Sequence, residues 1–102
     1  MERIQNKFMD DLFEWDKEKA ETNLKKHDVS FEEAETVFSD SLSLTVPDPL
    51  HSDYENHLII TGYSNQQRQI VVVHTDRGDK IRIVSARLAT PGERRKYEQE
   101  TR

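Results

Sequence analysis

The spacing of apolar residues changes near residue 42, and this change limits the folds open to the chain. Before it, apolar residues recur at helical intervals, as in residues 31–38. After it, Leu42, Leu44 and Val46 alternate with polar residues, the pattern of a strand with one buried face. Helices that precede a block of strands favour an α+β layer fold over alternating β-α units.

The first predicted helix follows a short aromatic strand at residues 12–15. Asp16 is a good N-cap for this helix, which extends to about His27. Ala20, Leu24 and His27 fall at i, i+4 and i+7 and predict a narrow apolar stripe beneath a charged exterior.

Capping signals mark the other two helices. Ser30 and Glu33 have the spacing of a capping box at the start of the second helix. Residues 90–93 repeat that spacing, with Pro91 at the first helical position of a short basic helix. We therefore expect the order β-α-α-β-β-β-β-α, with strands at 12–15, 42–46, 57–63, 68–75 and 81–88 and helices at 16–27, 30–38 and 90–99.

The predicted architecture is a small, curved antiparallel sheet with the two N-terminal helices packed on one face and a short C-terminal helix. Residues 1–11 show no clear period, and we expect them to be a flexible leader. Residues 12–102 then form a single domain, as the total of 102 residues requires.

Charge is distributed unevenly along the chain. The net charge is −5, but residues 1–40 carry −6, residues 41–65 carry −3 and residues 66–102 carry +4. Phosphate binding depends on local charge, so an RNA-binding C-terminal third is compatible with the acidic total. Coating of DNA by the whole molecule is not.

Several site classes lack their signals in the sequence. There is no cysteine, which excludes disulfides, thiolate metal sites and cysteine nucleophiles. The four histidines lack the i, i+4 spacing of a helical zinc site, and no phosphate-binding glycine motif occurs. We expect no metal and no cofactor. No stretch approaches a membrane span or a secretory signal, so we expect a cytoplasmic protein.

Residues 51–57 are the segment with the most side chains suited to acid–base catalysis. His51 and Glu55 lie there with a second imidazole, His57, just before a strand. RNA cleavage requires a base for the 2′-hydroxyl, an acid for the leaving oxygen and cations for the phosphorane charge. His51 and Glu55 are candidates for the acid and base, although the segment can equally be an ordinary solvated loop.

The candidate cations lie in the basic C-terminal third. Arg82 and Arg87 share the last strand, and an arginine fork suits a phosphate better than a lysine does. Five positions apart, they face opposite sides of a regular strand unless a bulge re-aims one of them. The residues expected to steer RNA are Arg68, Lys80, Arg94 and Arg95, each of which can also be plain surface charge.

Four segments of this chain resemble the BrnT family of type II toxins, in the same order and with matching spacing. They are FEWDKEKAETNLKKHDVSFEEAETVFSD, PDPLHSDYEN, GYSNQQRQIVVVH and IRIVSARLATPGERRKYE, which together run from about residue 12 to residue 98. The resemblance implies a RelE-like fold and a metal-independent ribonuclease that arrests translation and growth. It also implies a BrnA-type antitoxin with a ribbon-helix-helix domain, with operator DNA bound only through that antitoxin.

The resemblance carries over to individual polar positions. Those that match the family's characteristic residues are Lys26, His27, His51, Glu55, Arg68, Arg82, Ser85, Arg87, Glu93 and Arg94. Lys26, His27 and His57 are further possible site residues. Family members usually carry Arg at the position of His57, so a titratable group here replaces a permanent cation.

Two readings of function therefore remain open. The first is an endoribonuclease toxin. The second is a catalytically weak or inactive toxin fold that binds the antitoxin and modulates its operator binding, which the acidic N-terminal region favours. A direct DNA binder is least consistent with the sequence, because no long basic recognition helix is predicted.

Overall fold

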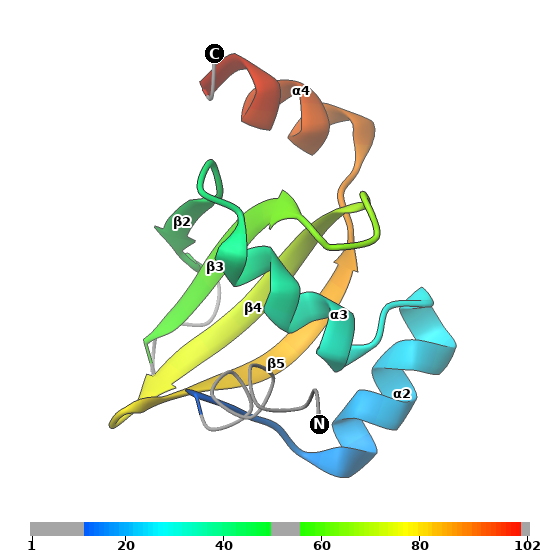
Figure 1. The fold of residues 1–102 in the computed structure, drawn as a ribbon, viewed down its shortest axis with the longest axis vertical. Helices are drawn as coiled ribbons and strands as arrows, with labels where there is room; N and C mark the ends of the chain where they lie inside the picture. The colour runs from blue at the N-terminus through cyan, green and yellow to red at the C-terminus, as the bar shows by residue number, and fades with distance from the viewer. Residues whose placement is uncertain (1–11, 50–55, 101–102) are drawn as a thin grey trace, which may run out of the picture.

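The computed structural model describes residues 12–49 and 56–100, in which the predicted order of elements is confirmed (Figure 1). A short 3-10 helix, η1, continues the second helix of the sequence prediction. The predicted leader, residues 1–11, lies outside the described residues. The elements are β1 (Phe13–Glu14), α2 (Lys17–His27), α3 (Phe31–Thr36), η1 (Val37–Ser39), β2 (Leu44–Pro47), β3 (His57–Tyr63), β4 (Gln69–Arg77), β5 (Lys80–Leu88) and α4 (Pro91–Glu100).

The five strands form one mixed sheet with the order β1-β5-β4-β3-β2. The four strands from β2 to β5 are antiparallel neighbours, but β1 runs parallel to β5. The prediction of an entirely antiparallel sheet is therefore wrong at β1. Two helices and three strands separate β1 from β5 along the chain, so no hairpin turn fixes their relative direction.

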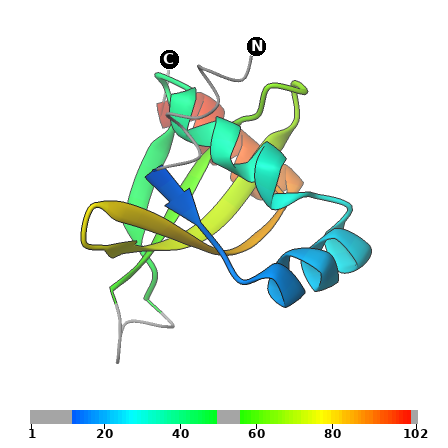
Figure 2. The same cartoon turned by 60° about the horizontal axis from the view of Figure 1, so that its bottom comes forward.

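The two N-terminal helices occupy different places on the sheet. In Figures 1 and 2, α3 and η1 lie across one face, whereas α2 lies beside the edge at β5. Only α3 therefore takes the position that the sequence predicted for both helices. The loop at Asp28, whose φ of 59° is left-handed, ends α2 and starts the turn into α3.

The inward face of α2 is built around Asn23. Its side-chain amide donates hydrogen bonds to the carbonyl oxygens of Val29 at 2.9 Å and Ala86 at 2.8 Å, and accepts one from the N–H of Ala86 at 3.1 Å. Leu24 is 48% exposed, so the predicted stripe through Leu24 is wrong. The helix packs against the edge of a strand, where unpaired backbone groups require a polar side chain.

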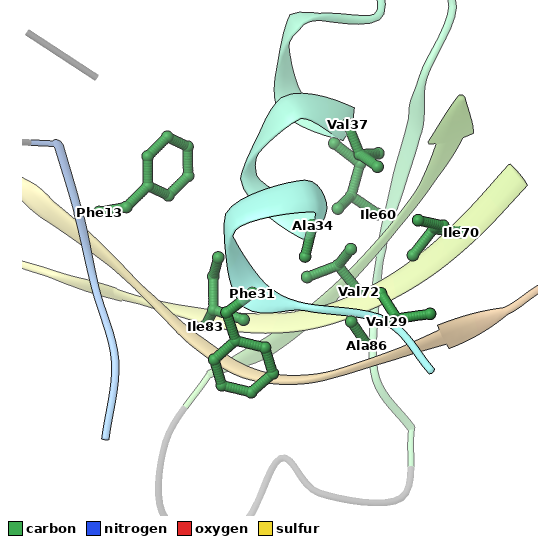
Figure 3. Close-up of a cluster of buried hydrophobic side chains, with 10 residues drawn as sticks. All are labelled: Phe13, Val29, Phe31, Ala34, Val37, Ile60, Ile70, Val72, Ile83 and Ala86. Atoms are coloured by element: carbon green, nitrogen blue, oxygen red, sulfur yellow. The ribbon is translucent and has the colours of Figure 1, made fainter. Parts of the chain in front are cut away.

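The core lies between α3 and the sheet. Figure 3 shows Phe31, Ala34 and Val37 directed from the helical segment towards the strands. Phe38 extends this core, with its ring edge-on to that of Phe13 at a centroid distance of 5.0 Å. The remaining buried members are Val29, Ile60, Ile70, Val72, Ile83 and Ala86.

The N-caps form as the sequence predicts. Asp16 accepts a hydrogen bond from the N–H of Glu18 at 2.8 Å, and Ser30 accepts one from the N–H of Glu33 at 2.9 Å. The carboxylate of Glu33 does not complete the predicted box; it binds Arg68 instead. None of the described helices has the length and hydrophobicity that a membrane crossing requires.

Candidate functional site

The second face of the sheet is the one that points away from α3. Side chains alternate along each strand, so residues paired in register lie in rows across a face. Three such rows belong to the second face. They are Leu44, Thr61, Val71 and Arg87; then Val46, Ile59, Val73 and Ser85; then His57, Thr75, Arg82 and Glu14.

A β-bulge places both arginines of β5 on this second face. The register between β4 and β5 shifts after Val73, where β5 contains one extra residue, Val84. The bulge offsets the odd spacing of Arg82 and Arg87, whose side chains in a regular strand point to opposite faces. Both arginines, with Ser85 between them, therefore face the same side.

Arg87 is held by the first turn of α4. Its Nη1 and Nη2 atoms each donate to a different carboxylate oxygen of Glu93, both at 2.8 Å. Glu93 also accepts from the N–H of Thr90 at 2.9 Å, while its own N–H donates to the Thr90 hydroxyl at 3.2 Å. The predicted capping box is thus confirmed, and one carboxylate both caps α4 and binds Arg87.

The pairing keeps both groups charged. The hydrogen bonds from Arg87 are the main cause that lowers the pKa of Glu93 to about 2, and the same bonds raise the pKa of Arg87. The side chains are 42% and 38% exposed, so a phosphate can reach the arginine.

The other end of α4 is anchored by Tyr97. Its hydroxyl donates to Asp40 at 2.8 Å, and its ring lies edge-on to that of Tyr63 at 5.7 Å. Burial and the Asp40 carboxylate raise the pKa of Tyr97 to about 12. A groove of about 280 Å³ lies between α4 and the second face. Its lining includes the apolar residues Leu44, Val46, Ile59 and Val71 and the charged residues Arg87, Glu93, Lys96 and Glu100.

Arg82 lies at the other end of the second face. Its Nε atom donates to Glu14 at 3.1 Å, across the β1–β5 pairing. In the same row, Thr75 separates Arg82 from His57. His57 is therefore about 10 Å from Arg82 across two strand spacings, on the face that bears both arginines.

Arg68 has a different environment. It donates to the carboxylate of Glu33 through Nε at 3.0 Å and through Nη2, and to the carbonyl of Asp28 at 2.9 Å. Ser64 donates to the same carboxylate at 2.6 Å. Hydrogen bonds from Arg68 are the main cause that lowers the pKa of Glu33. This cluster joins the β3–β4 turn to α3, and an RNA contact for Arg68 stays a prediction.

The remaining predicted cations lie in three separate places. Lys80 begins β5 at the hairpin end, and Arg94 and Arg95 are exposed on α4. Lys26 and His27 end α2 and line a second, shallow groove between α2 and β5. The relative positions of these groups could not be predicted from the sequence, because they depend on the strand register and on where α2 packs against β5.

Both candidates for proton transfer, His51 and Glu55, lie outside the described residues. Their roles stay predictions. Within residues 12–49 and 56–100, no three His, Asp or Glu side chains gather in a group that can hold a metal ion.

Sequence reasoning missed four residues that shape the site. They are Glu14, Asn23, Asp40 and Tyr97, each of which contacts a residue more than fifty positions away. Of these four residues, only Asn23 had a local signal in the sequence, because it is a polar residue at a position where its helix faces the rest of the protein.

The fold and its arginine-bearing face define a small α+β protein with a five-stranded mixed sheet and a C-terminal helix beside the site. The fold is similar to the crystal structure of the ribonuclease toxin BrnT from Brucella abortus, with a TM-score of 0.61 and 24% sequence identity. That similarity covers 78% of this chain and 97% of the other. Among curated proteins, none matches the sequence.

A family model described as "Ribonuclease toxin, BrnT, of type II toxin-antitoxin system" matches residues 15–93. The chain belongs to this family of toxins. Type II toxins act together with an antitoxin, so the family gives this chain an antitoxin partner.

Proposed function

We propose that this protein is an endoribonuclease that cleaves RNA, arrests translation and growth, and requires no metal. The observation that carries the proposal is the Val84 bulge, which places Arg82, Ser85 and Arg87 on one face. Two guanidinium groups on one face can hold a phosphodiester and stabilise the charge that develops on it. The family description supports ribonuclease chemistry.

The reaction in this proposal is attack of a 2′-hydroxyl on the adjacent phosphate, which forms a P–O bond and releases the 5′-oxygen of the next nucleotide. His51 or Glu55 accepts the proton from the 2′-hydroxyl, and the other donates a proton to the leaving oxygen. Arg82 and Arg87 neutralise the phosphorane oxygens. A phosphate must compete with Glu14 and Glu93, which already bind these arginines.

The binding partners in the proposal follow from the family and from charge. Arg68, Lys80, Arg94 and Arg95 steer RNA towards the second face. A BrnA-type ribbon-helix-helix antitoxin neutralises the toxin in the cytoplasm, and the complex reaches operator DNA only through that antitoxin. The RelE-like description of the fold belongs to the same proposal.

A second candidate function is a toxin fold with little activity that binds the antitoxin and modulates its operator binding. One observation favours it: both arginines of the second face are paired with carboxylates in the described structure. The net charge of −5 adds to the cost of bringing RNA to this surface.

Growth arrest and mRNA decay after induction of the chain alone, with and without Arg87→Ala, test the proposal. We expect arrest with the parent chain and about 10²- to 10³-fold slower cleavage with Arg87→Ala, the usual effect of a lost transition-state donor. The control is Lys25→Ala, which removes one exposed positive charge of α2 that has no role in this proposal. Antitoxin binding should survive in both variants.

Two results would contradict the enzyme proposal. Retained toxicity of Arg87→Ala would remove Arg87 from the reaction. Harmless expression of the parent chain, with normal antitoxin binding, would establish the second candidate function instead. Cleavage of purified RNA with and without a chelator tests whether a metal is required.

A further inference from the structure

The groove between α2 and β5 lies where the sheet has no neighbouring strand. β1 pairs with β5 only at Ile81 and Arg82, and beyond that point α2 flanks the edge (Figure 2). Asn23 fixes the helix there through its bonds to Ala86. The groove encloses about 420 Å³ and is lined by Asp16, Glu18, Lys19, Thr22, Asn23, Lys26, His27, Val84 and Ser85.

Basic side chains line this groove without carboxylate partners. Within the described parts of the chain, Lys19, Lys26 and His27 form no ion pair. This differs from Arg82 and Arg87, which are both paired. Lys19 and Lys26 lie two helical turns apart, about 10.5 Å along the axis, and so supply positive charge near both ends of α2.

Ser85 connects this groove with the second face of the sheet. It lines the groove and also lies in the middle row of that face, between the rows of Arg82 and Arg87. A chain of phosphates that crosses the two arginines can therefore continue past Ser85 to Lys26. The bulge at Val84, which aligns the arginines, also forms part of the groove wall.

We propose that the α2–β5 groove binds the phosphate backbone of single-stranded RNA next to the nucleotides held by Arg82 and Arg87. This inference rests on the proposed function. Unpaired lysines at separate points suit a ligand with regularly repeated negative charges, such as a nucleic-acid backbone. Because Ser85 lines both the groove and the second face, one RNA strand can extend from the arginines into the groove. The carboxylates of Asp16 and Glu18 line the same groove. The phosphate contacts in this proposal are therefore Lys19 and Lys26.

Binding of a fluorescent 2′-O-methyl RNA oligonucleotide tests the groove separately from cleavage. Its 2′-oxygen cannot attack the phosphate, so only affinity is measured. Lys26→Ala should weaken binding about threefold or more and lower the salt slope of log Kd by about 0.7, the value for one phosphate contact on a single strand. Lys19→Ala combined with Lys26→Ala should lower the slope by about 1.4.

The matched control is Lys25→Ala, which removes the same charge from the neighbouring residue, outside the groove lining. If Lys25→Ala and Lys26→Ala have equal Kd values and salt slopes, the inference is wrong. It is also wrong if Lys26→Ala leaves RNA binding unchanged and weakens the antitoxin complex, because the groove is then a protein interface.

Failure of the inference and failure of the proposed function have different signatures. If the parent protein cleaves RNA and the two lysine variants behave alike, only the groove assignment fails. If the parent protein binds the oligonucleotide but cleaves no RNA, and Lys26→Ala weakens binding, the groove stands and the enzyme proposal fails. If the parent protein neither binds nor cleaves, both fail.

Discussion

Arg87 and Glu93 form a two-bond ion pair, with both N–O distances at 2.8 Å. The pKa of Glu93 is lowered to about 2, chiefly by these bonds from Arg87. The carboxylate therefore stays ionised across the physiological pH range, and acidity within that range does not release the arginine. In the proposed reaction, a phosphate that approaches Arg87 therefore meets an ionised Glu93 at any pH in that range.

Glu93→Gln should free Arg87 and tighten RNA binding. The amide oxygen of Gln can still accept from the N–H of Thr90, so the helix cap is retained while the negative charge is lost. We expect a lower Kd for 2′-O-methyl RNA by roughly threefold, since a partly exposed pair contributes at most about 1 kcal/mol. Fluorescence anisotropy at fixed salt measures the change.

Glu98→Gln is the matched control for this change, because it removes the same charge from an exposed position of α4. It should alter Kd only through long-range charge. Equal effects of the two variants would show that Glu93 does not compete with RNA for Arg87.

His57→Arg should increase RNA cleavage. His57 lies in the row of Arg82 on the second face, so Arg at this position adds a permanent cation about 10 Å from Arg82. We expect roughly a threefold to tenfold higher rate, below the effect of a donor on the reacting atoms. His57→Gln is the uncharged control, and an unchanged rate in the arginine variant would exclude a phosphate contact here.

Asn23→Ala should destabilise the fold strongly. The substitution leaves the N–H and carbonyl of Ala86 and the carbonyl of Val29 without the amide that satisfies them. Each unsatisfied buried group costs about 1–3 kcal/mol, and water at the edge recovers part of that. We expect a loss of about 2–4 kcal/mol in urea unfolding, compared with a small change for the exposed Thr22→Ala.

His74→Leu should stabilise the protein and weaken its acid sensitivity. His74 is buried beside Phe38, at 4.8 Å between ring centroids, and neither ring nitrogen has a hydrogen-bond partner. Burial lowers the pKa of His74 below 6.5, and the charge of Asp76 only partly opposes this shift. The unfolded chain therefore takes up the proton first.

The consequence for pH has a definite sign. The parent protein keeps its full stability from this group above pH 6.5 and loses it as pH falls through and below that value. His74→Leu should gain about 1–2 kcal/mol at pH 7, and its free energy of unfolding should decrease less than that of the parent protein as the pH falls below 6.5. Thermal unfolding across this range measures it. If the stability of His74→Leu falls with decreasing pH as steeply as that of the parent protein, other groups cause the acid sensitivity.

Local patterns predicted most of the fold. The capping spacings predicted the starts of α2, α3 and α4, and the strands expected at 68–75 and 81–88 match β4 and β5 to within two residues. The parallel pairing of β1 was not predictable from neighbouring residues. It depends on where two helices and three strands bring the chain.

The site was predicted less completely, for a related reason. Arg82 and Arg87 were identified by residue type, and the need for a bulge followed from their spacing. The position of the bulge and the carboxylates that bind the arginines depend on strand register and on α4. Glu14, for example, is sixty-eight positions from Arg82 and shares no local pattern with it.

The bulge at Val84 has a consequence for comparing related chains. A relative that lacks one residue between the two arginines retains both letters in an alignment, separated by a single gap. In its strand, however, a shift of one position turns one arginine to the core side. The number of residues between Arg82 and Arg87 therefore carries information that their identity does not, and a gap there marks a chain whose two arginines no longer share one face of the sheet.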